Sequence, residues 1–243
     1  MEEKDVINDL LNIIFKATNS NIANEIFSFY LKNKKDDKPI YNLFGDAFLS
    51  IHAYCGLIFE NCWSQAFTIL RMALEQVSTL TILSLYPDLV SEYLSLHKLK
   101  CDYYSVEENE EKRINFINEH NLPKNKMQLK RYFDYSWVSK ITKSTKNDLN
   151  DLIRIANLCA FKGNLDTILS ASAHGQLPIF QLSGPDGKWG VMKKVGLTES
   201  KACCKLFHFL CIAYANYTSV LELEIATDGL CNDFAELWLK FLK

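Results

Sequence analysis

Glycine and proline are scarce in this sequence, with 9 and 5 residues among 243. A fold with many strands needs many tight turns, and these two residues are prominent in such turns. Their scarcity argues against a many-stranded β fold and favours helices. Apolar residues make up 48% and charged residues 23%, which is ordinary globular composition. Disordered, collagen-like and low-complexity chains are therefore excluded.

Positive charge is not in excess, since 27 Lys and Arg residues stand against 29 Asp and Glu residues, a formal net charge of −2. A chain with this balance has no strong field to collect nucleic acid non-specifically. Arginine is rare, at Arg71, Arg113, Arg131 and Arg154. Because only arginine offers a planar fork of donors, each of the four is a candidate binding residue.

Paired metal-binding motifs are also missing. The eight cysteines include no C-x-x-C pair, and zinc sites use clustered Cys and His at set spacings. We expect reduced thiols, mostly buried, and neither a disulfide scaffold nor a metal. The sequence has no G-x-G-x-x-G, no phosphate-binding glycine loop, no G-x-S-x-G and no H-E-x-x-H, so it predicts no cofactor and none of the common catalytic signatures.

Long uncharged apolar runs are absent as well. The most apolar stretch, residues 45–86, is interrupted by Asp46, Glu60, Arg71 and Glu75, whereas a membrane span needs about 20 nearly uncharged residues. The first eleven residues carry five charges and do not read as a signal peptide. We expect a cytoplasmic protein with no membrane segment.

What is present is helical periodicity. Apolar residues recur at helical spacing over most of the chain, and we expect helices over residues 5–33 (with a break near 19–21), 41–60, 63–85, 87–105, 107–120, 124–141, 148–173 (one helix, interrupted near Gly163 between 148–161 and 164–173), 198–226 and 232–243. The sequence thus predicts one all-α domain, residues 1–243, built as a multi-helix bundle of about eight or nine helices. Residues 175–196 hold five of the nine glycines and predict a small hairpin-like insertion before the long C-terminal helix.

Within the expected helix 63–85, Arg71 and Glu75 are the only charged residues. They lie four apart and share one face. The rest of this helix is apolar on most of its circumference, so we expect the pair to be at least partly buried. A buried ion pair adds little stability. The pair therefore has two interpretations: it fixes the register of neighbouring helices, or it belongs to a functional site.

The third candidate residue is His174, in Ser170–Ala171–Ser172–Ala173–His174–Gly175. In the structural interpretation, Gly175 caps the C-terminal end of a helix, and a cationic His174 interacts favourably with the helix dipole. The His-Gly pair then needs no catalytic role. In the functional interpretation, His174 faces Arg71 and Glu75 across a cleft. It would then act as general base, with Arg71 stabilising an anion and Glu75 orienting the imidazole.

Arg71-x-x-x-Glu75 after Trp63-x-x-Ala66, followed by the helix end Ser170 to Gly175, resembles the bacterial helical family called domain of unknown function 5677. The resemblance covers about residues 41–192 and implies that Arg71, Glu75 and His174 are the family's shared polar positions. The family is similar in build to the HEPN helical superfamily, which includes ribonucleases of toxin and phage-defence systems.

HEPN nucleases carry an Arg and a His with four to six residues between them. Arg113 and His120 have six residues between them and match that spacing, but Ile114 departs from the usual polar residue and the neighbours are acidic, so a surface helix is the better interpretation.

Two function hypotheses follow. The first is a helical interaction or ligand-sensing module of a bacterial phage-defence or toxin–antitoxin type system, which binds a second copy or a partner protein. The second is a HEPN-like, metal-independent ribonuclease that cleaves RNA with Arg71, Glu75 and His174. The first is the prediction and the second its alternative, because a chain without excess positive charge argues against a nuclease that acts as a monomer.

Overall fold

The computed structural model describes residues 3–19, 22, 24, 26, 28, 38–144, 146–156, 158, 193–218 and 229–242. Helices make up nearly all of this part of the chain, and no strand occurs within it. The all-α class and the bundle architecture expected from the sequence are confirmed. Nine α-helices of seven residues or more lie among these residues, in agreement with the expected eight or nine.

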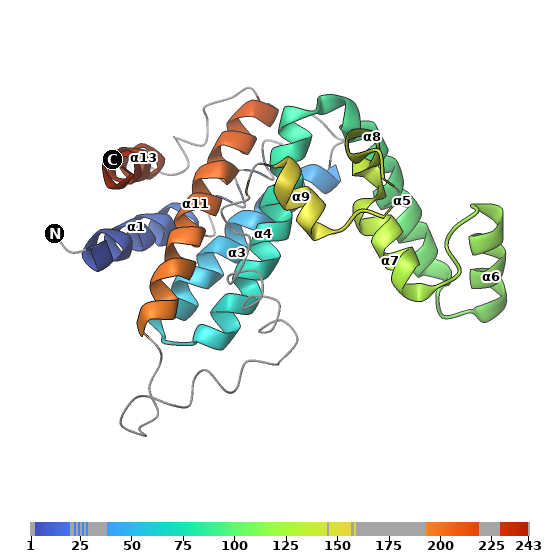
Figure 1. Ribbon diagram of the computed structural model, residues 1–243, viewed down its shortest axis with the longest axis horizontal. Helices are drawn as coiled ribbons and strands as arrows, with labels where there is room; N and C mark the ends of the chain where they lie inside the picture. The colour runs from blue at the N-terminus through green and yellow to red at the C-terminus, as the bar shows by residue number, and fades with distance from the viewer. Residues whose placement is uncertain are drawn as a thin grey trace, which may run out of the picture.

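The centre of the bundle is an antiparallel pair of long helices, α3 (Lys38–Phe59) and α4 (Trp63–Leu85). The connection is tight because Asn61 takes a left-handed φ of 58°, which asparagine tolerates better than most residues. The Cys62 N–H then donates to the Leu57 carbonyl over 2.7 Å and closes the end of α3. The short turn forces the two helices side by side (Figure 1).

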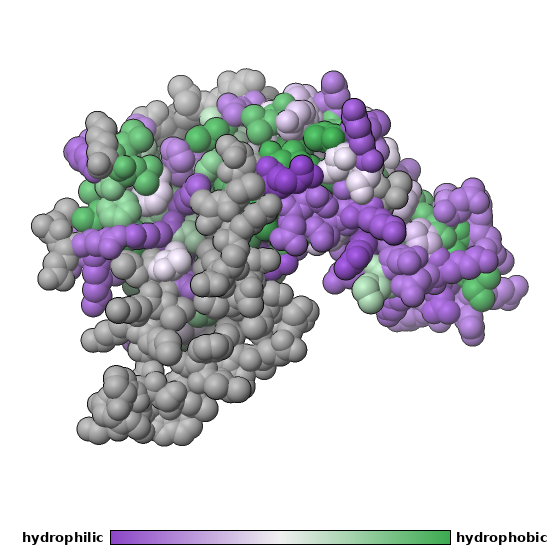
Figure 2. Space-filling model, in the orientation of Figure 1, coloured by the Kyte–Doolittle hydropathy of each residue, from purple (hydrophilic) through white to green (hydrophobic). Residues whose placement is uncertain are grey.

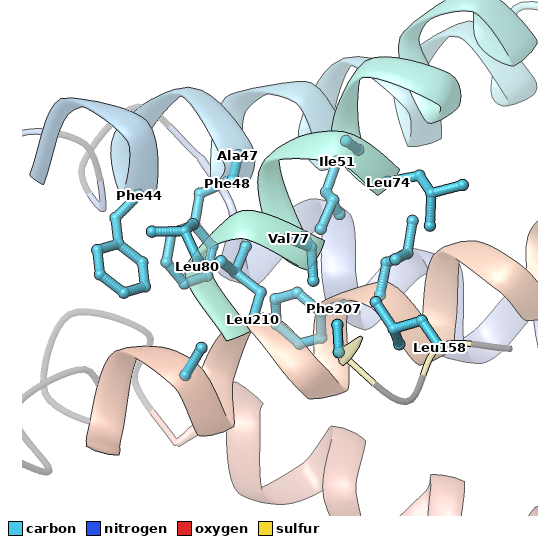
Figure 3. Packing of buried hydrophobic residues seen from close by; sticks show 14 of the residues in the cluster. Phe44, Ala47, Phe48, Ile51, Leu74, Val77, Leu80, Leu158, Phe207 and Leu210 are labelled. Atoms are coloured by element: carbon cyan, nitrogen blue, oxygen red, sulfur yellow. The ribbon is translucent and has the colours of Figure 1, made fainter. Parts of the chain in front are cut away.

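The core forms where α3 and α4 meet α11 (Lys193–Thr218). Figure 3 shows the apolar side chains of these three helices pointing toward one another. Nine of them have no exposed surface: Phe44, Ala47, Phe48 and Ile51 of α3, Leu74, Val77 and Leu80 of α4, and Phe207 and Leu210 of α11. Their burial removes apolar surface from water, which is the main stabilising term in folding.

Two terminal helices complete the core on the far side of α11 from the lobe described next. Helix α1 (Glu3–Ala17) and helix α13 (Leu230–Phe241) lie side by side (Figure 1). Phe234 and Trp238 bury one face of α13, and Lys201 of α11 pairs with Glu3 of α1. We call α1, α3, α4, α11 and α13 the core.

The remaining helices project from the end of α4 as a lobe (Figure 1). They are the 3₁₀ turn η2 (Pro87–Leu89), α5 (Val90–Val106), α6 (Glu110–Glu119), α7 (Lys126–Tyr135), the 3₁₀ turn η3 (Ser136–Val138) and α8 (Ser139–Thr142). Local sequence explains where two of them begin, because Asn109 and Asn125 each accept backbone N–H groups of the following turn. A capping box of Asp148 and Asp151 starts α9 (Leu149–Ile155), which packs on α4.

Some expected boundaries are wrong. The segment 124–141 is three short helices, because the hydrogen bonding tightens to a 3₁₀ turn at Ser136. The long C-terminal helix begins at Lys193 rather than near residue 198, so residues 193–196 belong to α11 and not to the insertion. The rest of the expected insertion, 175–192, and the expected helix 164–173 lie outside the described residues.

Two helices, Lys38–Phe59 and Gln65–Leu85, are long and apolar enough to cross a membrane by length and composition alone. This is weak evidence, because a buried core helix passes the same test, and both helices pack against α11 and each other. The expected lack of a membrane segment stays a prediction.

Candidate functional site

Arg71 and Glu75 lie on one face of α4, as their spacing predicts. Arg71 Nη1 and Glu75 Oε2 are 3.9 Å apart. The Arg71 side chain keeps 21% of its surface exposed and the Glu75 side chain 41%, so the pair lies at the edge of the core and not inside it. A half-exposed pair at this separation contributes at most about 1 kcal/mol to stability. Stability alone is therefore a weak reason for its position.

Glu75 has a second partner from the lobe. The Tyr135 hydroxyl at the end of α7 donates to Glu75 Oε1 over 3.1 Å. Burial and the Glu75 carboxylate raise the pKa of Tyr135 well above its usual value, so the hydroxyl keeps its proton. Because Arg71 contacts one carboxylate oxygen and Tyr135 the other, the orientation of Glu75 is fixed from both the core and the lobe.

Beside Glu75 lies a cavity of about 260 Å³ between α4, α5 and α7. Glu75, Gln76 and Thr79 of α4 line one wall, and Tyr93, His97 and Lys100 of α5 line the other. A neighbouring cavity of about 410 Å³ begins at the first turns of α3 and shares Leu43, Tyr93 and His97 with it. We call the two together the cleft. It lies at the boundary between the core and the lobe.

One buried polar group in the cleft wall lacks a partner. Gln76 Oε1 is buried, and no hydrogen bond to it occurs within the part of the chain that the structure describes. Thr79, one turn further along α4, is 7% exposed and lines the same cavity. A buried polar group without a partner costs about 1–3 kcal/mol. Groups of this kind in a cavity wall are available to a ligand.

The opposite wall supplies uncharged groups with shifted pKa values. Burial, with the nearby carboxylates of Asp134 and Glu75, raises the pKa of Tyr93 to about 12. Burial and the Lys100 ammonium lower the pKa of His97 below its ordinary value. At neutral pH Tyr93 is therefore a hydrogen-bond donor and His97 a neutral imidazole.

Two ion pairs lie at the first cavity of the cleft. Lys100 Nζ lies 2.6 Å from Asp134 Oδ1, and Arg71 lies beside Glu75. The second cavity is also lined by Lys38 and Asp46, so the walls present amide, hydroxyl and imidazole groups together with charges of both signs. Such a surface suits a small polar molecule that combines donors and acceptors.

The third expected site residue, His174, lies outside the described residues, so its distance to Arg71 stays a prediction. Arg113, of the pair at HEPN-like spacing, lies on α6, and His120 directly follows the last residue of that helix. Arg113 contacts Glu110 at 3.9 Å, and the His120 ring lies 4.4 Å from the Phe116 ring between centroids. The surface interpretation of that pair agrees with these contacts.

The sequence patterns did not single out Tyr135, Gln76, Thr79 or the α5 wall of the cleft. The α5 wall does have a local signature in the sequence, because Tyr93, His97 and Lys100 recur at helical spacing and so share a face. The bond from Tyr135 to Glu75 joins residues 60 apart and has no local signature.

Among the described residues, no group of three or more His, Cys, Asp or Glu side chains is placed to hold a metal ion. No protein-family model, no curated protein and no solved structure matches the chain. The residues that line the cleft are therefore the basis for the function proposed below.

Proposed function

We propose that this protein is a helical ligand-sensing module that binds a small polar molecule in the cleft. The observation that carries the proposal is the buried, unpartnered Gln76 Oε1 in the cavity wall, with the Thr79 side chain lining the same wall. A ligand that donates a hydrogen bond to this amide oxygen offsets its desolvation, and this gain adds to its affinity.

The position of the cleft supports sensing as well as binding. One wall belongs to α4 of the core and the other to α5 of the lobe. A ligand that contacts both walls favours the arrangement in which they lie at the right separation. Occupancy of the cleft then changes how firmly the lobe is held against the core, which a partner protein or a second copy can read.

Two threonines of α4 give a matched test. Thr79 and Thr81 are both more than nine-tenths buried. Only Thr79 lines the cavity. Thr79→Val and Thr81→Val therefore make the same change on one helix, one at the cleft and one outside it.

The experiment is a thermal-shift screen of the wild-type chain against amino acids, nucleosides and sugars, followed by calorimetric titration. A compound that raises Tm should bind Thr79→Val about tenfold more weakly, a loss of about 1.4 kcal/mol, and Thr81→Val as tightly as wild type. Equal binding by all three chains places the ligand elsewhere, and a screen without any stabilising compound contradicts the proposal.

The proposal includes self-association and a bacterial phage-defence or toxin–antitoxin setting in the cytoplasm. Support for self-association comes from large apolar side chains on the surface, such as Leu85 at the end of α4 and Leu239 and Leu242 near the chain end. Support for the setting comes only from the resemblance to domain of unknown function 5677. Sedimentation equilibrium tests the first: a single monomeric species at all concentrations contradicts it.

A metal-independent ribonuclease of HEPN type is the second candidate. The observation that favours it is His97, a neutral imidazole in the same cavity as Glu75. RNA cleavage without metal needs a base for the 2′-hydroxyl proton and a cation for the phosphate. His97 or His174 would supply the base and Arg71 the cation.

The test is incubation of the wild-type chain with single-stranded RNA in the presence of EDTA. If the candidate holds, Arg71→Ala abolishes cleavage and shifts Tm by only a few degrees, since a half-exposed pair contributes at most about 1 kcal/mol. Intact RNA with the wild-type chain, or equal cleavage by Arg71→Ala, contradicts it.

A further inference from the structure

The lobe carries a second hollow, on the side of α5 and α7 that adjoins α6. A cavity of about 440 Å³ lies between α5, α6 and α7, and another of about 590 Å³ lies between α5 and α7. They share Tyr103, Glu107, Lys126 and Leu129, so they form one continuous depression. We call it the lobe groove. Its lining residues differ from those of the cleft except for Phe133.

The lobe groove has an apolar floor and an apolar mouth. Tyr103, Leu129 and Phe133 form the floor and are buried. At the mouth, Met127 is 66% exposed, with Tyr104 and Ile114 about half exposed. Three large apolar side chains at one depression are costly in water, and apolar surface of this kind marks sites that another molecule covers.

The rim is positively charged, in contrast to the whole chain with its net charge of −2. Four basic residues line the groove, Arg113, Lys124, Lys126 and Lys130, against one acidic residue, Glu107. Arg113 also contacts Glu110 of α6 at 3.9 Å, so the three lysines carry most of the excess charge. Lys126 contacts Glu107 at 3.7 Å, but its side chain is 92% exposed. This pair is therefore weak, and a partner carboxylate can replace Glu107.

We propose that the lobe groove docks an acidic amphipathic helix of a partner protein. Leucine-like side chains of that helix enter between Met127, Tyr104 and Ile114, and its carboxylates face the basic rim. Single-stranded nucleic acid fits less well, because bases stack on a series of exposed aromatic faces and Tyr104 is the one large ring at the mouth. This inference does not depend on the cleft or its ligand.

Fluorescence anisotropy with a labelled synthetic helix tests the proposal on the full chain. The probe has leucines at i, i+3, i+4 and i+7 spacing and glutamates elsewhere, and a second probe has lysine in place of every glutamate. The glutamate probe should bind, more weakly as salt rises, and the lysine probe should bind at least tenfold more weakly, a difference of about 1.4 kcal/mol. Equal binding of both probes, or binding of poly-uridine RNA without binding of the glutamate probe, overturns the proposal.

Charge reversal locates the site. The double variant Lys126→Glu with Lys130→Glu should raise Kd about tenfold or more, a loss of at least about 1.4 kcal/mol. The matched control, Lys98→Glu with Lys112→Glu, makes the same change of net charge at lobe residues that do not line the groove and should change Kd less than twofold. Circular dichroism checks that both variants fold. Equal losses in the two variants show that binding follows net charge and overturn the groove as the site.

If a second copy of the chain fills the groove, sedimentation shows a wild-type dimer that Lys126→Glu with Lys130→Glu dissociates, and this result also overturns the proposal.

Discussion

The core and the lobe differ in how completely they bury apolar side chains. In the core, Phe44, Phe48, Leu74, Leu80 and Phe207 have no exposed surface. In the lobe, Trp137 and Val138 of η3 are as buried as the core, but the most buried residues of α5 to α7 keep a few per cent exposed, as at Tyr103 and Leu129. Figure 2 shows mostly hydrophilic surface over the lobe, with a few apolar spots. Three long helices enclose a core completely, whereas the shorter helices of the lobe cover one another only in part.

This difference has a consequence for function. A tightly packed core resists rearrangement, while a lobe with fewer buried contacts opens at lower free energy. The cleft lies at the boundary, with α4 on one side and α5 on the other. A ligand bound as proposed would contact both the tightly packed core and the less completely buried lobe.

The largest expected effect comes from removing a ring from each region. Phe48 lies in the centre of the core with no exposed surface and Phe133 in the lobe at 5%. Phe48→Ala should lower the free energy of unfolding by about 3–5 kcal/mol, because the surrounding helices cannot close the cavity. Phe133→Ala should cost about 2 kcal/mol, since the lobe can relax around it. Urea denaturation measures both, and equal losses would contradict the comparison.

The next effect concerns a carboxyl group inside the core. Glu199 of α11 is 1% exposed, and its Oε2 has no hydrogen-bond partner in the described part of the chain. Burial raises its pKa from 4.5 to about 7. The folded state therefore holds this proton more tightly than the unfolded state does. Its contribution to stability is fully present below pH 4.5 and is lost as the pH rises toward 7.

Glu199→Gln should remove this loss, because glutamine carries no charge at any pH. We expect the variant to be more stable than wild type at pH 8 by about 2–3 kcal/mol, because wild type must ionise a buried carboxyl whose pKa is raised to about 7, and the two chains to converge near pH 5. Exposed Glu236 provides the control: Glu236→Gln should keep the wild-type pH profile. Thermal unfolding between pH 5 and 8 measures the difference, and parallel profiles for Glu199→Gln and wild type would refute it.

The smallest effect is expected at surface ion pairs, where the two regions should behave alike. Lys240 contacts Glu236 at 3.8 Å in α13 of the core, and Arg113 contacts Glu110 at 3.9 Å in α6 of the lobe. Exposed pairs contribute about 0–1 kcal/mol. Lys240→Ala and Arg113→Ala should each change the free energy of unfolding by less than about 0.5 kcal/mol, again by urea denaturation. A loss above 2 kcal/mol in either variant would show that the ion pair stabilises the fold more than an exposed pair should, and would contradict this prediction.

The sequence predicted the helices well and the site only in part. Helix α4 runs from Trp63 to Leu85 as expected, because an apolar pattern with no proline or glycine determines it locally. The break at Ser136 inside the expected segment 124–141 was missed, since four aromatic residues there suggested one continuous helix. Local patterns predict helices because helical hydrogen bonds join residues four apart.

The site depends on contacts that no local pattern encodes. Arg71 and Glu75 were found because they lie one turn apart on one helix. The partners that make the cleft, Tyr135 on Glu75 and Asp134 on Lys100, come from α7, and their positions depend on how the lobe packs. Thr79 is one of several threonines in α4, and only the folded structure distinguishes it as part of a cavity wall.

The most direct test is to follow His97 itself. Its ring lines both cavities of the cleft, whereas His120 directly follows α6 and His208 lies on α11. With ¹³C-labelled histidine, the compound that raises Tm most should shift the ring signals of His97 in NMR spectra and leave those of His120 and His208 in place. A saturating compound that leaves His97 unmoved while shifting another histidine would contradict binding in the cleft.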